Sequence, residues 1–95
     1  MKNPVVYIMT NKRNGTLYTG VTSDLIKRVW QHKQGSFGGF SSKYKTTTLV
    51  YFEQCDSMLS AITREKQIKA GSRKKKLDLI DQLNPNWRDL YDDII

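Results

Sequence analysis

The first third of the sequence holds four side chains that bind anions or exchange protons, namely Tyr7, Tyr18, Arg28 and His32. On a helix, Arg28 and His32 form an i,i+4 pair at the edge of an apolar arc. That arc consists of Leu25, Ile26, Val29 and Trp30. A cation leaning toward the interior needs polar partners, and the tyrosines are candidates. In the alternative interpretation Arg28 binds a backbone carbonyl and His32 fills a boundary position. Lys27 and Gln31 fall on the opposite side, where we expect solvent.

The two tyrosines lie in segments whose pattern is typical of a β-hairpin. Residues Val5–Thr10 and Thr16–Val21 are rich in β-branched and aromatic side chains, and Asn14-Gly15 between them favours a two-residue turn. In such a turn, residues whose numbers sum to 29 face each other, which puts Tyr7 and Tyr18 on one face of the ribbon. A longer loop preserves this arrangement if the numbers of facing residues still add up to an odd number. If they add up to an even number, the two tyrosines fall on opposite faces.

A later helical segment places one carboxylate inside an apolar face. The face is formed by Met58, Ala61, Ile62 and Ile68. Glu65 projects within it, and burying that carboxylate unpaired would cost several kcal/mol. Lys69, one turn later, is one candidate partner, because Glu followed by Lys at i,i+4 is the favourable order. A divalent metal is the other. With a single carboxylate, Mg²⁺ would keep several waters or use phosphate oxygens of a substrate.

Periodicity and capping signals predict the remaining elements. We expect helices over residues 25–32, 58–69 and 73–83, and a third strand over 46–54. Candidate caps are residues 22–24 for the first helix and Asp56 or Ser57 for the second, and Gly35 and Gly71 are candidate ends. We expect residues 35–45, rich in Gly, Ser and Lys, to form a loop. The order ββαβαα predicts an α+β domain over residues 1–95, with a small three-stranded mixed or antiparallel sheet covered by helices.

The end of the chain is predicted to close the core. In the third helix we expect Leu77, Ile80 and Leu83 to be buried. Asn84-Pro85 ends this helix, because the residue before a proline disfavours the helical conformation. A short closing segment then follows, which lays Trp87 and Leu90 on the core.

The charge of the chain favours a polyanionic partner. The 95 residues carry a net charge of +7. Residues 1–76 hold fifteen basic and four acidic side chains, a charge of +11, whereas residues 77–95 hold one and five, a charge of −4. Such a surface attracts nucleic acid first and an acidic membrane second. The alternative is a basic surface that serves solubility alone.

Several classes of protein are excluded by the same sequence. No apolar run approaches the roughly 18 residues that cross a bilayer, and the first residues do not resemble a secretion signal. Cys55 is the single cysteine and His32 the single histidine, so an internal disulfide and a multi-histidine metal site are ruled out. We therefore expect a cytoplasmic protein with no membrane partner.

Taken together, the motifs resemble the GIY-YIG endonuclease superfamily. Five segments carry the resemblance, in the family's order: Val5-Val6-Tyr7, Tyr18-Thr19-Gly20, residues 23–28 with His32, residues 64–69 and residues 83–90. The last is similar to the C-terminal segment of small stand-alone bacterial members, described as URI-type or UvrC-like predicted endonucleases. Val5 and Val6 replace the Gly and Ile of the first tripeptide, and Thr19 replaces the Ile of the second. The tyrosines and Gly20 keep the pattern.

The resemblance implies phosphodiester hydrolysis of DNA with one divalent ion, Mg²⁺ or Mn²⁺. Carried over by position, Glu65 would hold the ion and Arg28 would bind phosphate oxygens, which suits its fork of donors. Tyr7 is the implied general base, aided by His32, and would need neighbouring cations to favour its phenolate, since free tyrosine has a pKa near 10. Tyr18 would position the water or the phosphate.

Other residues would support the substrate. Asn84 would position it or complete the metal shell, although Asn-Pro is also an ordinary helix stop. Sequence-independent phosphate contacts would come from Lys43, Lys45, Lys66, Lys69, Arg73, Lys74, Lys75 and Lys76. The four cations at 73–76 stand at a helix start, where the helix dipole disfavours positive charge, so their presence there suggests a role in binding. The alternative interpretation is a solvated helix start with no such role. Phe37, Phe40 and Tyr44 either stack on unpaired bases or cover the core.

Three functional hypotheses compete. The first is a metal-dependent DNA endonuclease, structure-selective or weakly sequence-specific because the chain ends at Ile95 without an added targeting domain. It would act in repair or recombination on branched or single-stranded DNA, with a protein partner for targeting. The second is a nucleic-acid-binding module that keeps the fold but cleaves little. The third is a small basic RNA-binding or ribosome-associated protein, which leaves Glu65 unexplained.

Overall fold

The computed structural model describes residues 3–35 and 39–95. The strands are β1 (Val5–Thr10), β2 (Leu17–Thr22) and β3 (Thr48–Gln54). The helices are α1 (Leu25–Gln34), α2 (Gly39–Tyr44), α3 (Met58–Ala70), α4 (Arg73–Leu83) and α5 (Tyr91–Ile94). The predicted α+β order is confirmed, with the short helices α2 and α5 added to it.

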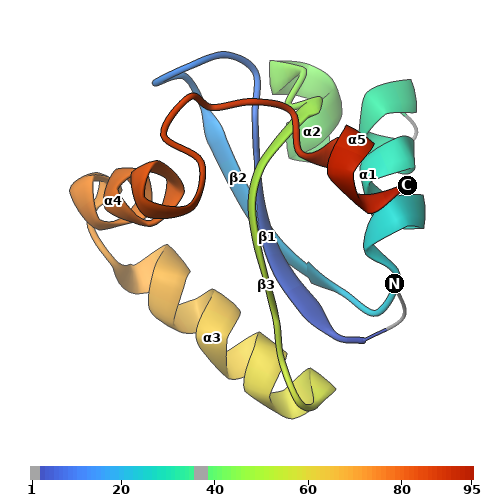
Figure 1. Ribbon diagram of the computed structural model, residues 1–95, viewed down its shortest axis with the longest axis vertical. Helices are drawn as coiled ribbons and strands as arrows, with labels where there is room; N and C mark the ends of the chain where they lie inside the picture. The colour runs from blue at the N-terminus through green and yellow to red at the C-terminus, as the bar shows by residue number, and fades with distance from the viewer. Residues whose placement is uncertain (1–2, 36–38) are drawn as a thin grey trace.

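The sheet is antiparallel, with strand order β2-β1-β3, and helices cover both faces. Figure 1 shows α1 and α5 on one side of the sheet and α3 and α4 on the other. All six residues of the central strand β1 are buried, because neither face meets solvent. Val5, Tyr7 and Met9 face α1, whereas Val6 and Ile8 face α3 and α4. Because β1 is buried on both faces, the strand carries the consecutive apolar residues Val5 and Val6 before Tyr7.

The hairpin differs from the predicted two-residue turn. Observed pairs have numbers that sum to 27, as in Tyr7 opposite Gly20, so β1 and β2 are joined by the six-residue loop 11–16. Asn14 keeps the left-handed conformation expected of it, with φ 58°, but inside this larger loop. The register is still an odd sum, and Tyr7 and Tyr18 share a face as predicted.

Residues 35–45 were expected to be a loop, but they include α2. The predicted end of α1 is confirmed, because Gly35 has φ 71° and caps the helix. Gly and Ser have low helix propensity, so local signals gave no indication of α2. Tyr44 is 40% exposed and Lys43 lies 5.4 Å from its ring centroid. Phe37 and the side chain of Phe40 lie outside the described part of the chain.

Three apolar side chains expected in the core are instead exposed: Trp30 at 51%, Met58 at 38% and Leu83 at 51%. Met58 is the first residue of α3 and Leu83 is the last residue of α4. On α1, only Leu25, Val29 and His32 are buried, a narrower stripe than the predicted arc. Trp87 and Leu90 are buried as predicted, on opposite faces of the sheet.

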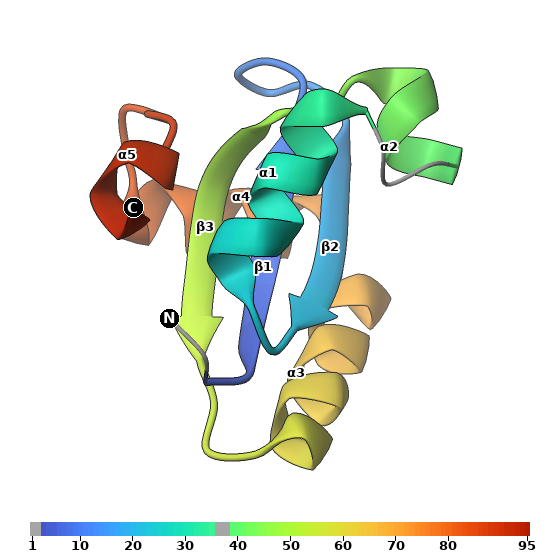
Figure 2. The ribbon, with the colours of Figure 1, turned by 90° about the vertical axis from the view of Figure 1, so that its right-hand side faces the viewer.

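The C-terminal segment covers the outer edge of β3. Asp89 accepts a hydrogen bond from the Leu49 amide at 3.2 Å, and the Leu90 amide donates to the Leu49 carbonyl at 2.8 Å. Asp89 also forms an ion pair with Lys33 of α1. One edge of the sheet is thereby covered, while β2 forms the other edge, as Figure 2 shows. Within the described ranges, no helix is both long and apolar enough to cross a bilayer.

Candidate active site

Three aromatic side chains from β1, β2 and α1 meet between the sheet and α1. The Tyr7 hydroxyl and Nε2 of His32 are 2.9 Å apart and share a hydrogen bond. Tyr18 packs against both, with ring centroids 6.2 Å from Tyr7 and 5.0 Å from His32. Tyr7 and His32 are almost completely buried. The fold therefore brings together three of the residues expected to act in catalysis, and we call them the aromatic cluster.

Burial sets the protonation of this cluster. It raises the pKa of Tyr7, with Tyr18 adding to the shift and the Arg28 guanidinium opposing it. Burial also lowers the pKa of His32 to about 4, and the charge of Arg28 acts in the same direction. Both groups are neutral near pH 7, so their hydrogen bond joins a phenol to a neutral imidazole. A phenolate on Tyr7 is not preformed in the free protein.

The low pKa of His32 predicts an acid-sensitive stability. Between about pH 6.5 and 4 the unfolded chain takes up a proton that the folded protein excludes, so the free energy of unfolding falls as the pH falls. We expect the wild type to lose up to about 3 kcal/mol more than His32→Gln between these limits. Urea melts of both proteins across this range measure the difference, and parallel pH dependences would contradict the assignment.

Gly20 leaves the space that the Tyr7 ring occupies. A Cβ at position 20 would lie 2.7 Å from the Tyr7 hydroxyl oxygen and 2.9 Å from Cε1 of Tyr18. Real Cβ atoms do not approach this closely, and Tyr7 has no free volume to move into because it is buried and hydrogen-bonded to His32. The glycine is therefore a positioning residue for the cluster, a role that its place in the sequence motif did not reveal.

Gly20→Ala is expected to displace the Tyr7 ring. Overpacking of this kind costs about 1–3 kcal/mol in the free energy of unfolding. The matched control is Gly71→Ala, where a Cβ would meet its nearest atom at 3.4 Å, an ordinary contact. Thermal melts of the two variants make the comparison. Equal melting temperatures for both would show that the cluster tolerates the added methyl group.

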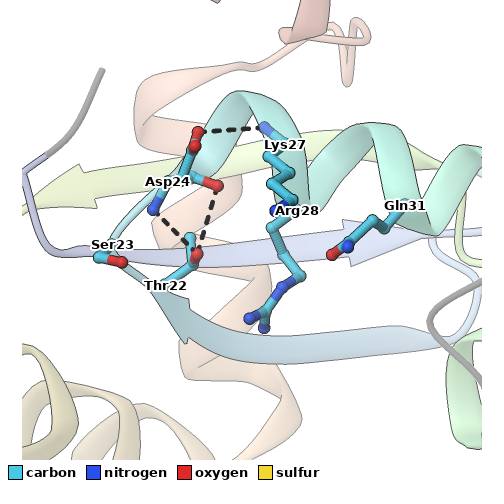
Figure 3. Close-up of a pocket in the computed structure, with 6 residues that line it drawn as sticks. All are labelled: Thr22, Ser23, Asp24, Lys27, Arg28 and Gln31. Atoms are coloured by element: carbon cyan, nitrogen blue, oxygen red, sulfur yellow. Dashed lines mark hydrogen bonds between the residues drawn. The ribbon is translucent and has the colours of Figure 1, made fainter.

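Beside the cluster, the flank of α1 forms an open pocket of about 410 Å³. It is lined by Thr22, Ser23, Asp24, Lys27, Arg28 and Gln31. Figure 3 shows the Arg28 side chain extending from α1 toward β2. Asp24 caps α1 by accepting a hydrogen bond from the Lys27 amide at 3.2 Å, and its own amide donates to Thr22 Oγ1 at 3.0 Å. These bonds fix the turn before α1 and hold the pocket's rim in place.

Lys27 and Gln31 were expected on a solvated side of α1, away from Arg28. Lys27 is exposed as expected, whereas Gln31 is half-buried, and both line the Arg28 pocket. A helical wheel measures position relative to the apolar stripe, but it does not show that residues 22–24 close a pocket on the flank of the helix. The pocket therefore combines two cations with hydroxyl and amide donors that suit phosphate oxygens, beside the Asp24 carboxylate, which accepts the Lys27 amide.

Glu65 lies on α3, which packs on the face of the sheet opposite α1. Its side chain is 16% exposed, and its Oε2 lies 3.4 Å from Nζ of Lys69. The predicted i,i+4 partner is therefore present, and Lys69 itself is 54% exposed. Figures 1 and 2 show α3 running beside β2, the edge strand that carries Tyr18. The helix that carries Glu65 and the strand that carries Tyr18 are thus neighbours in the fold.

The donor set at Glu65 is compatible with a magnesium ion bound mainly by water and substrate. Within residues 3–35 and 39–95, no three acidic, histidine or cysteine side chains gather to form a complete metal cage. Mg²⁺ is usually bound by one or two carboxylates together with waters and phosphate oxygens, so a full cage is not required. Lys69 pairs with Glu65 at its exposed end and would be displaced by an ion.

The cations expected to contact DNA fall into two groups. Seven of the eight are exposed, and Lys76 is half-buried. Three of the exposed ones have ion-pair or hydrogen-bond partners within the fold. Lys69 pairs with Glu65, and Lys74 pairs with Asp78 at 3.1 Å. Arg73 donates to the carbonyl oxygens of Asn14 and Gly15 at 2.8 and 2.7 Å, so it holds the β1–β2 loop.

Asn84 forms its hydrogen bonds with the backbone of β3 and of the C-terminal segment. Its Nδ2 donates to the carbonyls of Val50 and Arg88 at 3.2 and 2.8 Å, and its Oδ1 accepts from the Arg88 amide. Val50 sits where the pairing of β1 with β3 shifts by one residue, so Asn84 satisfies a carbonyl at a β-bulge. Position 84 is 3% exposed. This bonding pattern is that of a structural residue.

Comparison with known proteins agrees with the fold and the motifs. Residues 3–78 match the GIY-YIG catalytic domain, and the chain belongs to the GIY-YIG family. This places it in a superfamily of nucleases.

Small relatives match it along nearly their whole length. A UPF0213 protein of Syntrophus aciditrophicus is 40% identical over 86 residues, covering 90% of this chain and 97% of that protein. A UPF0213 protein of Staphylococcus saprophyticus is 38% identical over 82 residues, covering 86% and 99%. The solution NMR structure of a UPF0213 protein from Bacillus halodurans has a TM-score of 0.58 and 29% identity, with 92% of each chain covered.

Proposed function

We propose that the protein is a divalent-metal-dependent endonuclease that hydrolyses DNA phosphodiester bonds. The observation that carries the proposal is the buried hydrogen bond between Tyr7 and His32, placed beside Arg28 in a chain of the GIY-YIG family. A buried phenol–imidazole pair next to a cation is costly to build for stability alone. It provides a route for a proton beside an anion-binding site.

Proton transfer through the pair would avoid a preformed phenolate. Water would give its proton to Tyr7 Oη while the Tyr7 proton moves to Nε2 of His32, so that charge balances at each atom. The low pKa of His32 opposes this transfer in the free protein, but a bound phosphate dianion or diester would raise it by favouring the imidazolium. Arg28 would bind the phosphate oxygens, and Tyr18 would hold the water or phosphate against Tyr7.

Glu65 would hold the metal ion, Mg²⁺ or Mn²⁺. When bound there, the ion supplies charge stabilisation for the phosphorane-like transition state and lowers the pKa of coordinated water. Lys69 would release the carboxylate and turn toward the DNA backbone. Lys43, Lys45, Lys66, Lys75 and Lys76 would add sequence-independent phosphate contacts.

A non-catalytic DNA-binding or RNA-binding module is the second candidate. The observation in its favour is that Glu65 already has a cation partner in Lys69, which makes a metal ion unnecessary for its burial. In that case the aromatic cluster would serve the core alone.

The purified protein is to be incubated with single-stranded, nicked, flapped and branched DNA, and with RNA of the same sequence, in Mg²⁺, Mn²⁺ or EDTA. Cleavage that needs metal and is lost in Glu65→Ala and Tyr7→Phe supports the nuclease. Preference for branched or flapped DNA would support a role in repair or recombination. Binding without cleavage of any substrate in any metal would overturn the nuclease proposal in favour of the binding module.

A further inference from the structure

The β1–β2 loop, residues 11–16, is held by several hydrogen bonds within the loop and to the end of β1. Thr10 Oγ1 donates to the carbonyls of Lys12 and Thr16, and Asn11 Oδ1 accepts from the Thr16 amide at 3.0 Å. The Gly15 amide donates to the Lys12 carbonyl at 2.9 Å. Each bond removes conformational freedom that a simple connection would keep. The loop is therefore built to hold one shape.

Arg73 completes this network from a distant part of the chain. One of its terminal nitrogens donates to the carbonyl oxygens of Asn14 and Gly15, at 2.8 and 2.7 Å. The start of α4 is thus fastened to the loop across nearly sixty residues of sequence. The planar guanidinium fixes the directions of both N–H bonds on this nitrogen, whereas the three donors of a lysine ammonium rotate on a flexible stem.

The ordered loop presents positive charge without an internal partner. Lys12 and Arg13 are exposed, and in the described part of the chain no carboxylate lies within ion-pair distance of either. The sequence holds no Asp or Glu before Asp24, and Arg73 adds a third cation behind the loop. Unpaired cations on a fixed loop lose little entropy when they meet an anion, which favours binding.

The loop also lies close to the aromatic cluster. Thr16 is two residues before Tyr18, and a strand rises about 3.3 Å per residue, so the loop begins about 7 Å along β2 from the tyrosine. A DNA strand advances about 3.4 Å per nucleotide, which puts the loop a few nucleotides from the site. In Figure 2 the loop lies at the end of the sheet that α2 also borders, while α5 lies beside β3. Asp92 and Asp93 of α5 disfavour a DNA path on that side.

We propose that the β1–β2 loop is a preformed grip for the phosphate backbone of the DNA strand that enters the site. Lys12 and Arg13 contact phosphates directly, and Arg73 is a positioning residue that holds the loop rather than a phosphate ligand. This inference rests on the proposed DNA substrate, and it adds two contact residues that the basic composition alone did not distinguish.

The test compares two arginines that carry the same charge on different surfaces. Arg13→Ala and Arg88→Ala change the net charge equally, but Arg88 lies in the C-terminal segment, where it pairs with Asp93. Binding of a fluorescent DNA duplex is measured in EDTA from about 50 to about 200 mM salt. We expect Arg13→Ala to weaken binding about fivefold or more and to lower the salt slope by about 0.9, and Lys12→Ala/Arg13→Ala to lower it by about 1.8. Equal effects of Arg13→Ala and Arg88→Ala would overturn the grip.

Arg73→Lys tests the positioning role because the formal charge is kept. We expect faster amide hydrogen exchange at Gly15 and Thr16 and DNA binding weakened severalfold with the salt slope unchanged. Unchanged exchange in the loop would overturn the positioning role.

Failure of the grip is distinct from failure of the nuclease. Weaker binding by Arg13→Ala in a protein that cleaves no DNA would leave the grip in place and remove the nuclease. If the protein cleaves DNA with metal but Arg13→Ala binds DNA as tightly as wild type, the nuclease stands and the grip is overturned.

Discussion

Glu65→Gln is expected to reduce the rate of DNA cleavage by about a thousandfold while DNA binding is retained. Glutamine keeps the shape of the side chain but removes the negative charge that would hold a divalent ion, an interaction worth several kcal/mol in the transition state. DNA affinity should not fall, because one negative charge is removed from a basic surface. Single-turnover cleavage at saturating DNA, together with binding in EDTA, measures the two effects separately.

Lys69→Met is the matched control, because it breaks the same ion pair from the other side. Glu65→Gln should change the melting temperature by only a few degrees, whereas Lys69→Met leaves a largely buried carboxylate without its cation and should lower it further. Lys69→Met should weaken DNA binding without the large loss in rate at saturating DNA. An equal thousandfold loss in Lys69→Met would instead assign Glu65 a purely structural role.

Tyr7→Phe is expected to lower the cleavage rate by about 10²–10⁴-fold, because it removes the hydroxyl through which the proton would pass to His32. The ring remains, so packing against Tyr18 and Gly20 is preserved. The buried Nε2 of His32 loses its partner, and we expect a cost of about 1–3 kcal/mol in the free energy of unfolding.

Tyr18→Phe separates chemistry from packing in the same cluster. Both substitutions remove one hydroxyl, but only Tyr7 has its hydroxyl bonded to Nε2 of His32. A rate profile over pH at saturating DNA distinguishes them further: the limb that reports His32 in the wild type should be lost in Tyr7→Phe. If Tyr7→Phe cleaves as fast as wild type, the proton does not pass through this pair.

Local signals in the sequence determined much of the fold. The helix over 73–83 has the predicted bounds, Asp24 and Ser57 act as N-caps, and Gly35 ends α1 in the left-handed conformation. Each of these features depends on side-chain to backbone contacts within about four residues, so composition and spacing suffice to find them. The shared face of Tyr7 and Tyr18 also followed, because it needs only the parity of the register.

Contacts between distant segments escaped the same reasoning. The Asn14-Gly15 pattern indicated a tight turn, but Arg73 and Asn11 stabilise a longer loop in its place. The hydrogen bonds that join the Asn84 side chain to Val50 and Arg88 were likewise not indicated by the sequence. The loop depends on Arg73, which is far away in sequence, and the Asn84 bond depends on a β-bulge at Val50. No local sequence pattern predicts either contact.

By itself the sequence determined the family, the element order and the set of residues from which a site would be built. Only the tertiary structure decided how those residues meet: Tyr7 on Nε2 of His32, the ring of Tyr7 over Gly20, and Glu65 on the far face beside Lys69. The physical reason is that residue types and periodicity set which face each element buries. Hydrogen bonds across elements depend instead on where helices dock on the sheet, which is set by packing of the whole core.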